Sequence, residues 1–321
     1  MKLWVGVTDN NWFDVVSHTQ GIDEVNFWQP GGGTSFRVLQ PGEPFLFKLH
    51  SPLNFIVGGG FFAHWTRLPI SLAWEAFEVK NGAHSFDEMR KLIVKKRRGV
   101  TDRYKDFQIG CILLTQPFFF NREDWIRVPR DWHPSIQQGK QYLASEEPGK
   151  SLWERVSAFL AALPRYSKPE QRIEESPRFG KETFYRPRLG QGAFRVLVTD
   201  AYQRACAITE EHSLPALEAS HIKPFNESGP HAVNNGLLLR SDFHRLFDRG
   251  YITVTPEYKI EVSRRLREEF ENGRSYYPFQ GQKLHHLPGI KEDRPYKDLL
   301  TSDLLTRRHD FVGKYLTKAS R

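Results

Sequence analysis

The sequence predicts an α+β fold divided into two domains, and three observations lead to that prediction. The chain has 321 residues, more than one ordinary domain usually holds. Hydrophobic residues make up 39% of it and aromatic residues 13%, so sizeable cores are expected and a mainly disordered chain is excluded. The residue pattern also changes from strand-like to helical near position 149. We therefore expect a β-rich domain at 1–148, a helical linker at 149–188 and a second, mixed domain at 189–321.

The chain is basic and contains few cysteines. Its formal net charge is +8, which favours a polyanionic partner. Its two cysteines, Cys111 and Cys206, form no CxxC pair, so neither a structural zinc site nor a disulfide framework is expected. No apolar run approaches the roughly 20 residues of a membrane span, and the residues after Met1 do not resemble a secretory signal. These features predict a cytoplasmic protein that does not enter a membrane.

Runs rich in β-branched and aromatic residues account for most of the first domain. Pro52 and the glycines at 58–60 interrupt these runs, and the stretch 85–98 has a helical pattern. The expected strands cover residues 1–7, 44–49, 54–57, 61–68 and 109–120. The domain should therefore be mostly β, with few helices.

The linker is expected to begin with a helix. Apolar side chains recur at helical spacing over 151–163, and Pro164 ends that pattern. Residues 166–188 are polar and charged, and three prolines interrupt them. A helix followed by an irregular segment should therefore join the two domains.

The most informative stretch of the second domain is 217–250. Pro224 ends a strand-like run there, and a polar loop separates this run from a second one. Ser241 is a good helix N-cap, and Gly250 is a suitable residue to end that helix. The expected elements are a strand at 217–222, a strand at 236–239 and a helix at 242–249.

Four polar side chains fall at the ends of these elements. His221 ends the first strand, and Asn235 precedes the second. His244 lies in the first turn of the helix and Asp248 follows four residues later, so both lie on one helix face. Imidazole and carboxylate together suit a divalent cation that keeps open positions for water or phosphate. A histidine such as His221 can act as a general base on water, because its unperturbed pKa is near 6.5.

This order and spacing resemble the HNH nuclease family, whose ββα-metal fold has the same succession of elements. The resemblance covers residues 190–254 and is strongest in the phrases SHIKP and NNGLLLRSDFHRLFD. It implies that His221 deprotonates the attacking water and that Asn235 orients the loop bearing it. It also implies that His244 binds a divalent metal ion, with Mg²⁺, Mn²⁺, Co²⁺ and Ni²⁺ as the candidates.

One position departs from the family pattern. Many HNH enzymes carry an aspartate metal ligand immediately before the first histidine, and that position is Ser220 here. A second ligand must then come from elsewhere, with Asp248 as the first candidate and Glu218 as the second. An aspartate near a helix C-terminus also favours a nearby cation, which Arg245 or Arg249 would supply in the alternative interpretation.

Three phrases in the first domain also have a family resemblance. They are WVGVTDNNWF at 4–13, EVNFWQP at 24–30 and NFIVGGGFF at 54–62. They resemble the EVE group of the PUA-like superfamily, which implies a β-rich, barrel-like fold that binds nucleic acid. It also implies an aromatic pocket for a modified base flipped out of the helix, although most aromatic side chains of the domain are expected in its core. The expected pocket residues are Asn26, Trp28, Phe62 and Trp65.

An EVE-like domain joined to an HNH nuclease resembles a modification-dependent (type IV) restriction endonuclease. This resemblance implies that the protein binds double-stranded DNA carrying 5-methyl- or 5-hydroxymethylcytosine and cuts its backbone. Two alternatives stay open. One is an HNH nuclease without modification dependence. The other is a non-catalytic reader of modified bases or RNA, which Ser220 supports because a serine there leaves the metal ligands of the family pattern incomplete.

Basic side chains are expected to contact DNA phosphates, although such runs also occur on ordinary solvated surfaces. A single HNH site cuts one strand, so double-strand cutting requires a homodimer or two successive events. The expected backbone contacts are Lys95, Lys96, Arg97, Arg98, Arg188 and Arg195.

Overall fold

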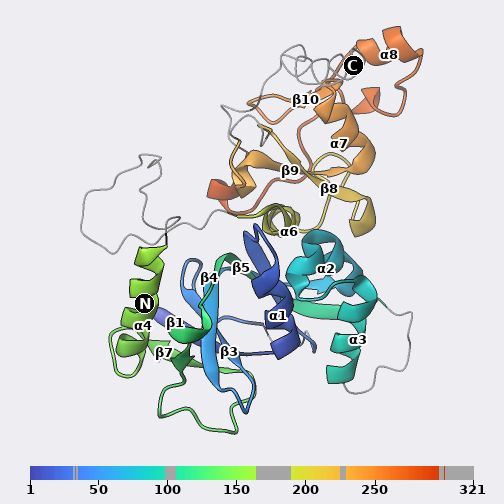
Figure 1. The fold of residues 1–321 in the computed structure, drawn as a ribbon. Coiled ribbons are helices and arrows are strands. Elements are labelled where there is room, and N and C mark those ends of the chain that lie inside the picture. The colour runs from blue at the N-terminus through green and yellow to red at the C-terminus, as the bar shows by residue number, and fades with distance from the viewer. Residues whose placement is uncertain are drawn as a thin grey trace, which may run out of the picture. The chain divides into compact units, whose positions relative to one another are not determined.

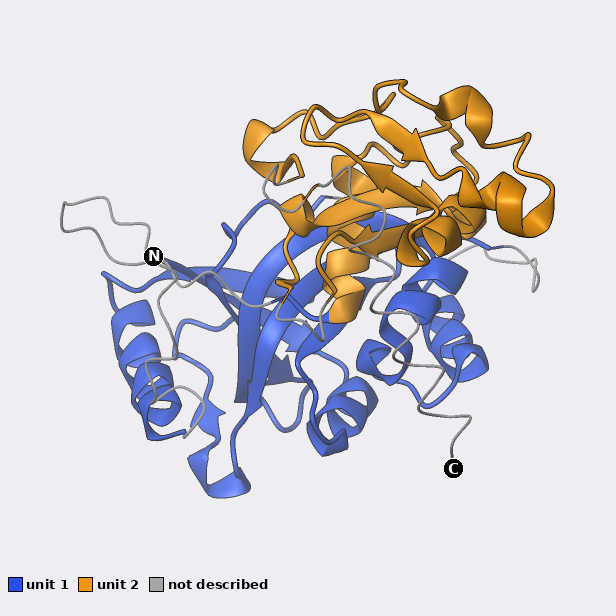
Figure 2. Cartoon of the chain, turned by 90° about the horizontal axis from the view of Figure 1, so that it is seen from above, with its two compact units in different colours: residues 1–190 blue, residues 191–321 orange. Residues whose placement is uncertain are grey.

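A computed structural model describes most of the chain as two compact units. The described residues are 1–31, 33, 35–97, 106–163, 189–224, 229–295 and 300. The units are Met1–Gly190 and Gln191–Arg321, shown in blue and orange in Figure 2. The irregular segment expected at 166–188 lies outside the described residues. In the part that is described, no helix combines the length and apolar character needed to cross a membrane.

The first unit combines strands and helices, so the α+β class is confirmed (Figure 1). Its strands are β1 (Lys2–Thr8), β2 (Glu24–Gln29), β3 (Pro44–Leu49), β4 (Phe55–Pro69), β5 (Gln108–Phe119), β6 (Ile126–Arg127) and β7 (Gly139–Leu143). Its helices are α1 (Asn10–His18), α2 (Ile70–Phe77), α3 (Phe86–Lys96) and α4 (Gly149–Ala162). The Ser85 hydroxyl caps α3 by accepting a hydrogen bond from the Glu88 backbone N–H at 3.2 Å.

Seven strands of the described residues form one sheet in the order β2-β5-β4-β3-β1-β7, with β6 paired to β4. β1 and β3 run parallel, and the other neighbouring pairs run antiparallel. β2 and β7 end this order and do not pair with each other among the described residues, so the sheet is not closed. The expected barrel-like form is therefore wrong. Closure depends on pairing between the first and last strands, which strand patterns along a sequence do not reveal.

The glycine run at 58–60 does not break a strand, as the sequence suggested, but lies inside β4. A Cβ atom at Gly59 would lie 2.7 Å from the Phe45 carbonyl oxygen and 2.8 Å from Cζ of Phe118. Glycine is therefore needed there because two neighbouring strands approach so closely. The pairing of β4 with β5 shifts register on both sides of Phe61, and such bulges bend a long strand.

The helix expected in the linker belongs to the core of the first unit. α4 buries Leu152, Val156 and Leu160, and these side chains pack in one cluster with sheet residues such as Leu3 and Phe118. Three buried leucine- or valine-sized side chains contribute about 1.5–3 kcal/mol each to stability. We therefore place the end of the first unit after α4 rather than before it.

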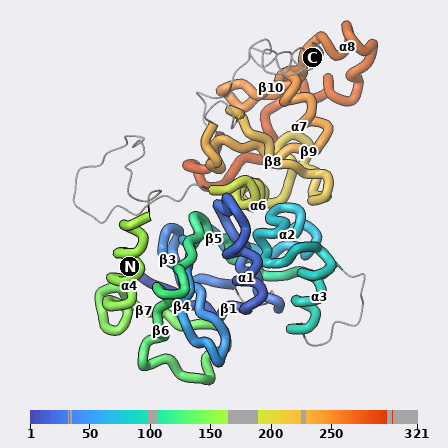
Figure 3. The backbone as a smooth tube through the Cα atoms, in the orientation of Figure 1, coloured from blue at the N-terminus to red at the C-terminus, as the bar shows by residue number. Residues whose placement is uncertain are grey.

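The second unit contains the elements expected near its chemistry. It begins with helix α6 (Gln191–Ala201), followed by β8 (Leu217–His221), β9 (Gly236–Arg240), α7 (Ser241–Asp248), β10 (Ile252–Val254), β11 (Ile260–Val262) and α8 (Arg265–Phe270). Its described part has two small antiparallel sheets, β8 with β9 and β10 with β11. The order strand, loop, strand, helix is thus confirmed and can be followed along the chain in Figure 3.

Helix α7 is amphipathic over only two turns. Phe243 and Phe247 are fully buried and lie four residues apart, which anchors one side of the helix in the core of the second unit. His244 and Asp248 follow them by one residue and stay partly exposed. The packing of the two phenylalanines therefore fixes which way the polar pair faces.

Candidate active site

His221 is held at the end of β8 by contacts on its face and on one edge. The ring of Phe194 from α6 stacks on it, with centroids 3.9 Å apart and planes inclined by 12°. Its Nε2 lies 3.0 Å from Nδ1 of His231, within hydrogen-bond distance. Nδ1 of His221 has no hydrogen-bond partner among the residues that the structure describes. One ring nitrogen is therefore engaged, and the other is open to a reactant.

The surroundings of His221 keep its ring neutral. Burial and the neighbouring His231 lower the pKa of His221 to about 4, while the charge of Asp248 acts in the opposite direction. An imidazole with so low a pKa is neutral at neutral pH, with a proton on one ring nitrogen and a lone pair on the other that can accept a proton. The same electrostatic coupling to Asp248 and His244 shows that these groups lie within range of one another.

Asn235 is fully buried and closes the neck of the loop between β8 and β9. Its Oδ1 accepts a hydrogen bond from the Lys223 N–H at 2.9 Å. Its Nδ2 donates to the carbonyl oxygens of Lys223 at 3.0 Å and Pro230 at 2.9 Å. The side chain thus joins the two ends of the loop that follows His221. The tip of this loop, 225–228, lies outside the described residues.

His244 on α7 lies between two carboxylates. Its Nδ1 is 2.5 Å from Oε2 of Glu218 on β8, and its Nε2 is 3.2 Å from Oδ2 of Asp248. Burial alone would lower the pKa of His244, but the hydrogen bonds and charges of Asp248 and Glu218 outweigh it, so the pKa is raised. The imidazole of the same helix face thus lies beside the Asp248 carboxylate.

The donor chemistry around His244 fits a divalent metal ion at one edge of its ring. Glu218 and Asp248 face opposite nitrogens, so an ion at Nε2 would have Asp248 beside it while Glu218 holds the proton on Nδ1. In the described part of the chain, no group of three or more His, Cys, Asp or Glu side chains is arranged to hold a metal. A two-donor set suits Mg²⁺ or Mn²⁺, which keep several waters and bind substrate phosphate.

Ser220, at the position where many HNH enzymes have an aspartate, contributes nothing to this set. Its side chain is fully buried, and its hydroxyl has no hydrogen-bond partner in the described part of the chain. Successive strand residues face opposite sides, so this position is turned away from the side that His221 occupies. The carboxylates that the structure places beside His244 are instead Glu218 of β8 and Asp248 of α7.

The basic residues expected at DNA differ in their surroundings. Lys95 is exposed at the end of α3, and Lys96 forms an ion pair with Asp9 at 2.8 Å. The Arg97 guanidinium donates to two backbone carbonyl groups, which ties it to its own unit. Arg195 lies on α6. Two of the expected residues, Arg98 and Arg188, lie outside the described residues.

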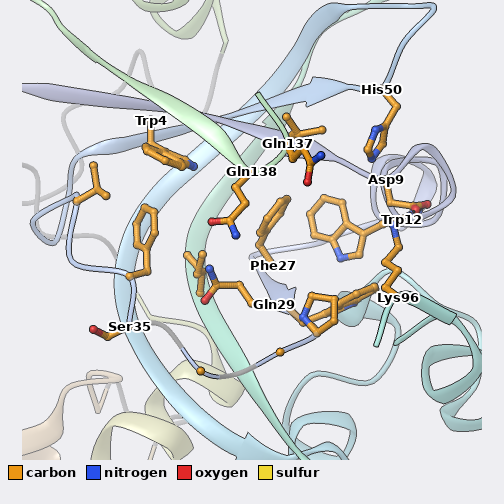
Figure 4. A pocket seen from close by; sticks show the side chains of 18 residues that line it. Trp4, Asp9, Trp12, Phe27, Gln29, Ser35, His50, Lys96, Gln137 and Gln138 are labelled. Atoms are coloured by element: carbon orange, nitrogen blue, oxygen red, sulfur yellow. Dashed lines mark hydrogen bonds and ion pairs between the residues drawn. The ribbon is translucent and has the colours of Figure 1, made fainter. Parts of the chain in front are cut away.

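The first unit contains a pocket of about 560 Å³ with aromatic walls (Figure 4). Figure 4 also shows Asp9, His50 and Lys96 together on one side of it. Its remaining polar lining includes the amides of Gln29 and Gln138. The aromatic walls are Trp4, Trp12, Phe27, Trp28 and Phe36.

Only one of the four expected pocket residues, Trp28, lines this pocket. Asn26 is fully buried, and its Nδ2 donates to Oδ1 of Asn81 at 2.9 Å. Phe62 and Trp65 line a second, more open cavity of about 430 Å³. The structure therefore separates these four residues, and it adds pocket residues from β1, α1 and the 137–138 segment.

Comparison with known protein families finds one match within the second unit. The model of a family described as HNH endonuclease matches residues 206–255, a range that includes His221, Asn235 and His244. No curated protein matches the chain. The geometry of β8, β9 and α7 and this match agree, and the second unit therefore carries an HNH endonuclease domain at residues 206–255.

Proposed function

We propose that this protein is a metal-dependent endonuclease that cuts DNA containing a modified cytosine. One observation carries the catalytic part of the proposal. Inside the HNH domain, a neutral imidazole with an open Nδ1, His221, lies in the electrostatic range of the His244–Asp248 pair. Hydrolysis of a phosphodiester needs a proton acceptor for the attacking water and ligands for a divalent ion, and a histidine–carboxylate pair can serve as those ligands.

Each polar residue of the site has a separate role in the proposed reaction. His221 takes a proton from water at Nδ1 as the water oxygen attacks phosphorus and the bond to the leaving oxygen breaks. His244 and Asp248 would hold the divalent ion, which supplies positive charge to the scissile phosphate when bound. Glu218 keeps the Nδ1 proton on His244 and so leaves Nε2 as the ligand atom. Asn235 holds the loop after His221 closed.

The pocket of the first unit supports the part of the proposal that concerns the modified base. A flipped base is read by stacking and by hydrogen bonds to its edge, and the pocket offers both aromatic rings and amide groups. Base–aromatic stacking contributes about 1–3 kcal/mol per base, and flipping costs a few kcal/mol. Two stacking walls and one or two edge contacts would therefore offset the cost of flipping.

Gln29 is an amide of the pocket lining whose orientation is fixed by a hydrogen bond. The Trp65 indole N–H donates to Oε1 of Gln29 at 3.0 Å. An indole nitrogen can only donate, so this bond fixes the amide with Nε2 as the end that remains available. We propose that Gln29 donates to an acceptor atom on the edge of the flipped base, such as the carbonyl oxygen of cytosine.

Cleavage of matched plasmids tests the proposal as a whole. One plasmid carries 5-methyl- or 5-hydroxymethylcytosine, the other none, and both are incubated with the full chain and Mn²⁺. Cutting of the modified plasmid alone is expected. Equal cutting of both would favour a nuclease without modification dependence. If neither is cut with Mg²⁺, Mn²⁺, Co²⁺ or Ni²⁺, the chain is a reader without nuclease activity.

Replacing Trp4 by alanine should weaken binding of modified DNA and leave the catalytic residues of the nuclease unit unchanged. Trp4 lines the pocket, and its ring contacts Phe36 edge-on with centroids 5.4 Å apart. Loss of one stacking wall should raise the Kd for modified duplex by roughly 5- to 100-fold. Fluorescence anisotropy with labelled duplexes measures this change.

Trp74→Ala is the matched control for that experiment. Trp74 is partly exposed like Trp4 but lies on α2 and does not line the pocket. Its variant should bind modified duplex as the unchanged protein does. Equal weakening by both substitutions would show that the pocket is not the binding site.

The same proposal assigns DNA phosphate contacts to Lys95 and Arg195. Such contacts confer affinity that falls with salt and carries no sequence information. Cutting of both strands by one HNH site per chain would require two copies or two successive cuts. Sedimentation with and without DNA distinguishes a homodimer from a monomer.

A further inference from the structure

We propose that His231 is a positioning residue that fixes the tautomer of His221 and thereby makes Nδ1 the proton-accepting atom. The inference rests on the proposed function, because it concerns the general base of the same reaction. The inference is based on the 3.0 Å contact between Nε2 of His221 and Nδ1 of His231. Among the described residues, this is the hydrogen-bond contact of the His221 ring.

A hydrogen bond between two imidazole nitrogens needs one proton, and only one of the two arrangements leaves a base. If His231 donates, a neutral His221 must carry its proton on Nδ1 and has no lone pair there for water. If His221 donates from Nε2, its Nδ1 keeps the lone pair. The second arrangement also suits the surroundings, since Nδ1 has no hydrogen-bond acceptor within the described part of the chain. His231 therefore acts as the acceptor.

The loop that carries His231 is built to hold it opposite His221. Asn235 binds the carbonyl oxygen of Pro230, the residue immediately before His231, and also both backbone groups of Lys223. In addition, the Ile222 N–H donates to the Asn235 carbonyl oxygen at 2.9 Å. The backbone on both sides of the histidine pair is thus fixed by one buried amide.

Two further contacts restrict the rings themselves. Phe194 stacks on His221, and its ring also lies 5.7 Å from that of His231, with the planes inclined by 53°. The two imidazole planes meet at 63° with centroids 5.0 Å apart, so an edge nitrogen of one ring points at the other. Phe194 is almost completely buried and cannot move aside easily. Rotation of His221 away from His231 is therefore opposed on its face.

The contact gains importance during the reaction. When Nδ1 of His221 accepts the proton from water, the ring becomes an imidazolium, and its Nε2–H bond to His231 becomes charge-assisted and stronger. A neutral His231 thus favours the charged form through this hydrogen bond, in the direction opposite to burial and to the repulsion that a protonated His231 would exert on the ring. This is the role that the orienting partner of a catalytic histidine plays in general.

Two substitutions at position 231 separate an acceptor from mere packing. In His231→Asn, Oδ1 falls near the place of the histidine Nδ1 and still accepts a hydrogen bond. His231→Leu has similar bulk but no acceptor. We expect kcat to stay within about threefold of the unchanged protein in the asparagine variant. In the leucine variant it should fall by roughly 10- to 100-fold with little change in KM.

The cleavage result can overturn the inference in two ways. If both variants lose activity equally, packing rather than hydrogen bonding explains the contact. If neither loses activity, His231 has no role in orienting the base. Thermal unfolding of both variants shows whether the leucine variant is folded. If it is not, the decision rests on the asparagine variant and on the spectroscopic test.

Nuclear magnetic resonance tests the tautomer without any cleavage. In the full chain labelled with ¹⁵N-histidine, we expect the His221 proton on Nε2 and a scalar coupling across the N–H···N bond to Nδ1 of His231. A proton on Nδ1 of His221 would overturn the inference. Failure of the proposed function would appear differently, as unchanged cleavage in a variant that lacks the His221 ring.

Discussion

Replacing His221 by alanine is expected to lower the rate of DNA cleavage by roughly 10²- to 10⁴-fold, the usual contribution of a general base. The residue supplies the neutral ring nitrogen that takes the proton of the attacking water, and its pKa, lowered to about 4, keeps that nitrogen available at neutral pH. Single-turnover cleavage of a modified duplex at saturating Mn²⁺ measures the loss. Binding of the duplex should stay unchanged, because His221 lies in the nuclease unit and its ring is held by protein contacts.

His212→Ala is the control for this substitution. His212 belongs to the same unit but is exposed, and its ring contacts only that of His286 among the aromatic contacts of the described residues. Its variant should cut DNA at the normal rate. Normal cutting by the His221 variant, with folding verified by circular dichroism, would require a different base and would remove the main argument of the proposed mechanism.

The chemistry of the HNH unit could be predicted from the sequence because its signals are local. Gly250 follows the end of α7 as predicted, but the expected N-cap at Ser241 is wrong by one residue, because α7 begins at Ser241 and Arg240 occupies the N-cap position without a side-chain capping bond. The four-residue spacing of His244 and Asp248 places them on one face whatever the rest of the chain does. The position of His231 could not be predicted in this way. Its contact with His221 crosses a loop and depends on closure of that loop by a buried amide.

The pocket of the first unit illustrates the opposite case. Its walls come from β1, α1, β2 and segments near residues 36 and 137, which the sheet order brings together from distant parts of the sequence. A composition of aromatic residues indicates that such a pocket can form but not which rings line it. One local signal was available: in β2, Asn26 is buried while Phe27 and Gln29 are partly exposed, as strand alternation predicts.

The glycine run in β4 shows why a local signal can also mislead. Three glycines in succession usually indicate a turn, yet a close approach between strands needs glycine equally. The two cases differ only in what lies nearby in space. Gly59 lies within a strand, and glycine is needed there because neighbouring strands occupy the space that a side chain would fill. Neither local pattern nor composition contains that information.

Replacing His244 by alanine is expected to weaken metal binding by at least about 100-fold and to lower cleavage at limiting metal to a similar degree. Of the two donors that face one another at 3.2 Å, this change leaves only Asp248. Calorimetric titration of the DNA-free protein with Mn²⁺ measures the affinity directly. His286→Ala, which changes a partly buried histidine elsewhere in the second unit, should bind Mn²⁺ normally. Equal affinity of the His244 variant and the unchanged protein would show that the metal site lies elsewhere.

The same arrangement predicts how cleavage depends on pH. The carboxylates of Asp248 and Glu218 raise the pKa of His244, so its protonated form persists to higher pH than for a free histidine. A metal ion must displace that proton, and its affinity should fall about tenfold for each pH unit below this pKa. His221 stays unprotonated over the same range because its pKa is lowered to about 4. The acid limb of the cleavage profile should therefore move to lower pH as Mn²⁺ is raised, whereas a limb that stays fixed would mean that protonation of the base, and not competition at His244, limits the reaction.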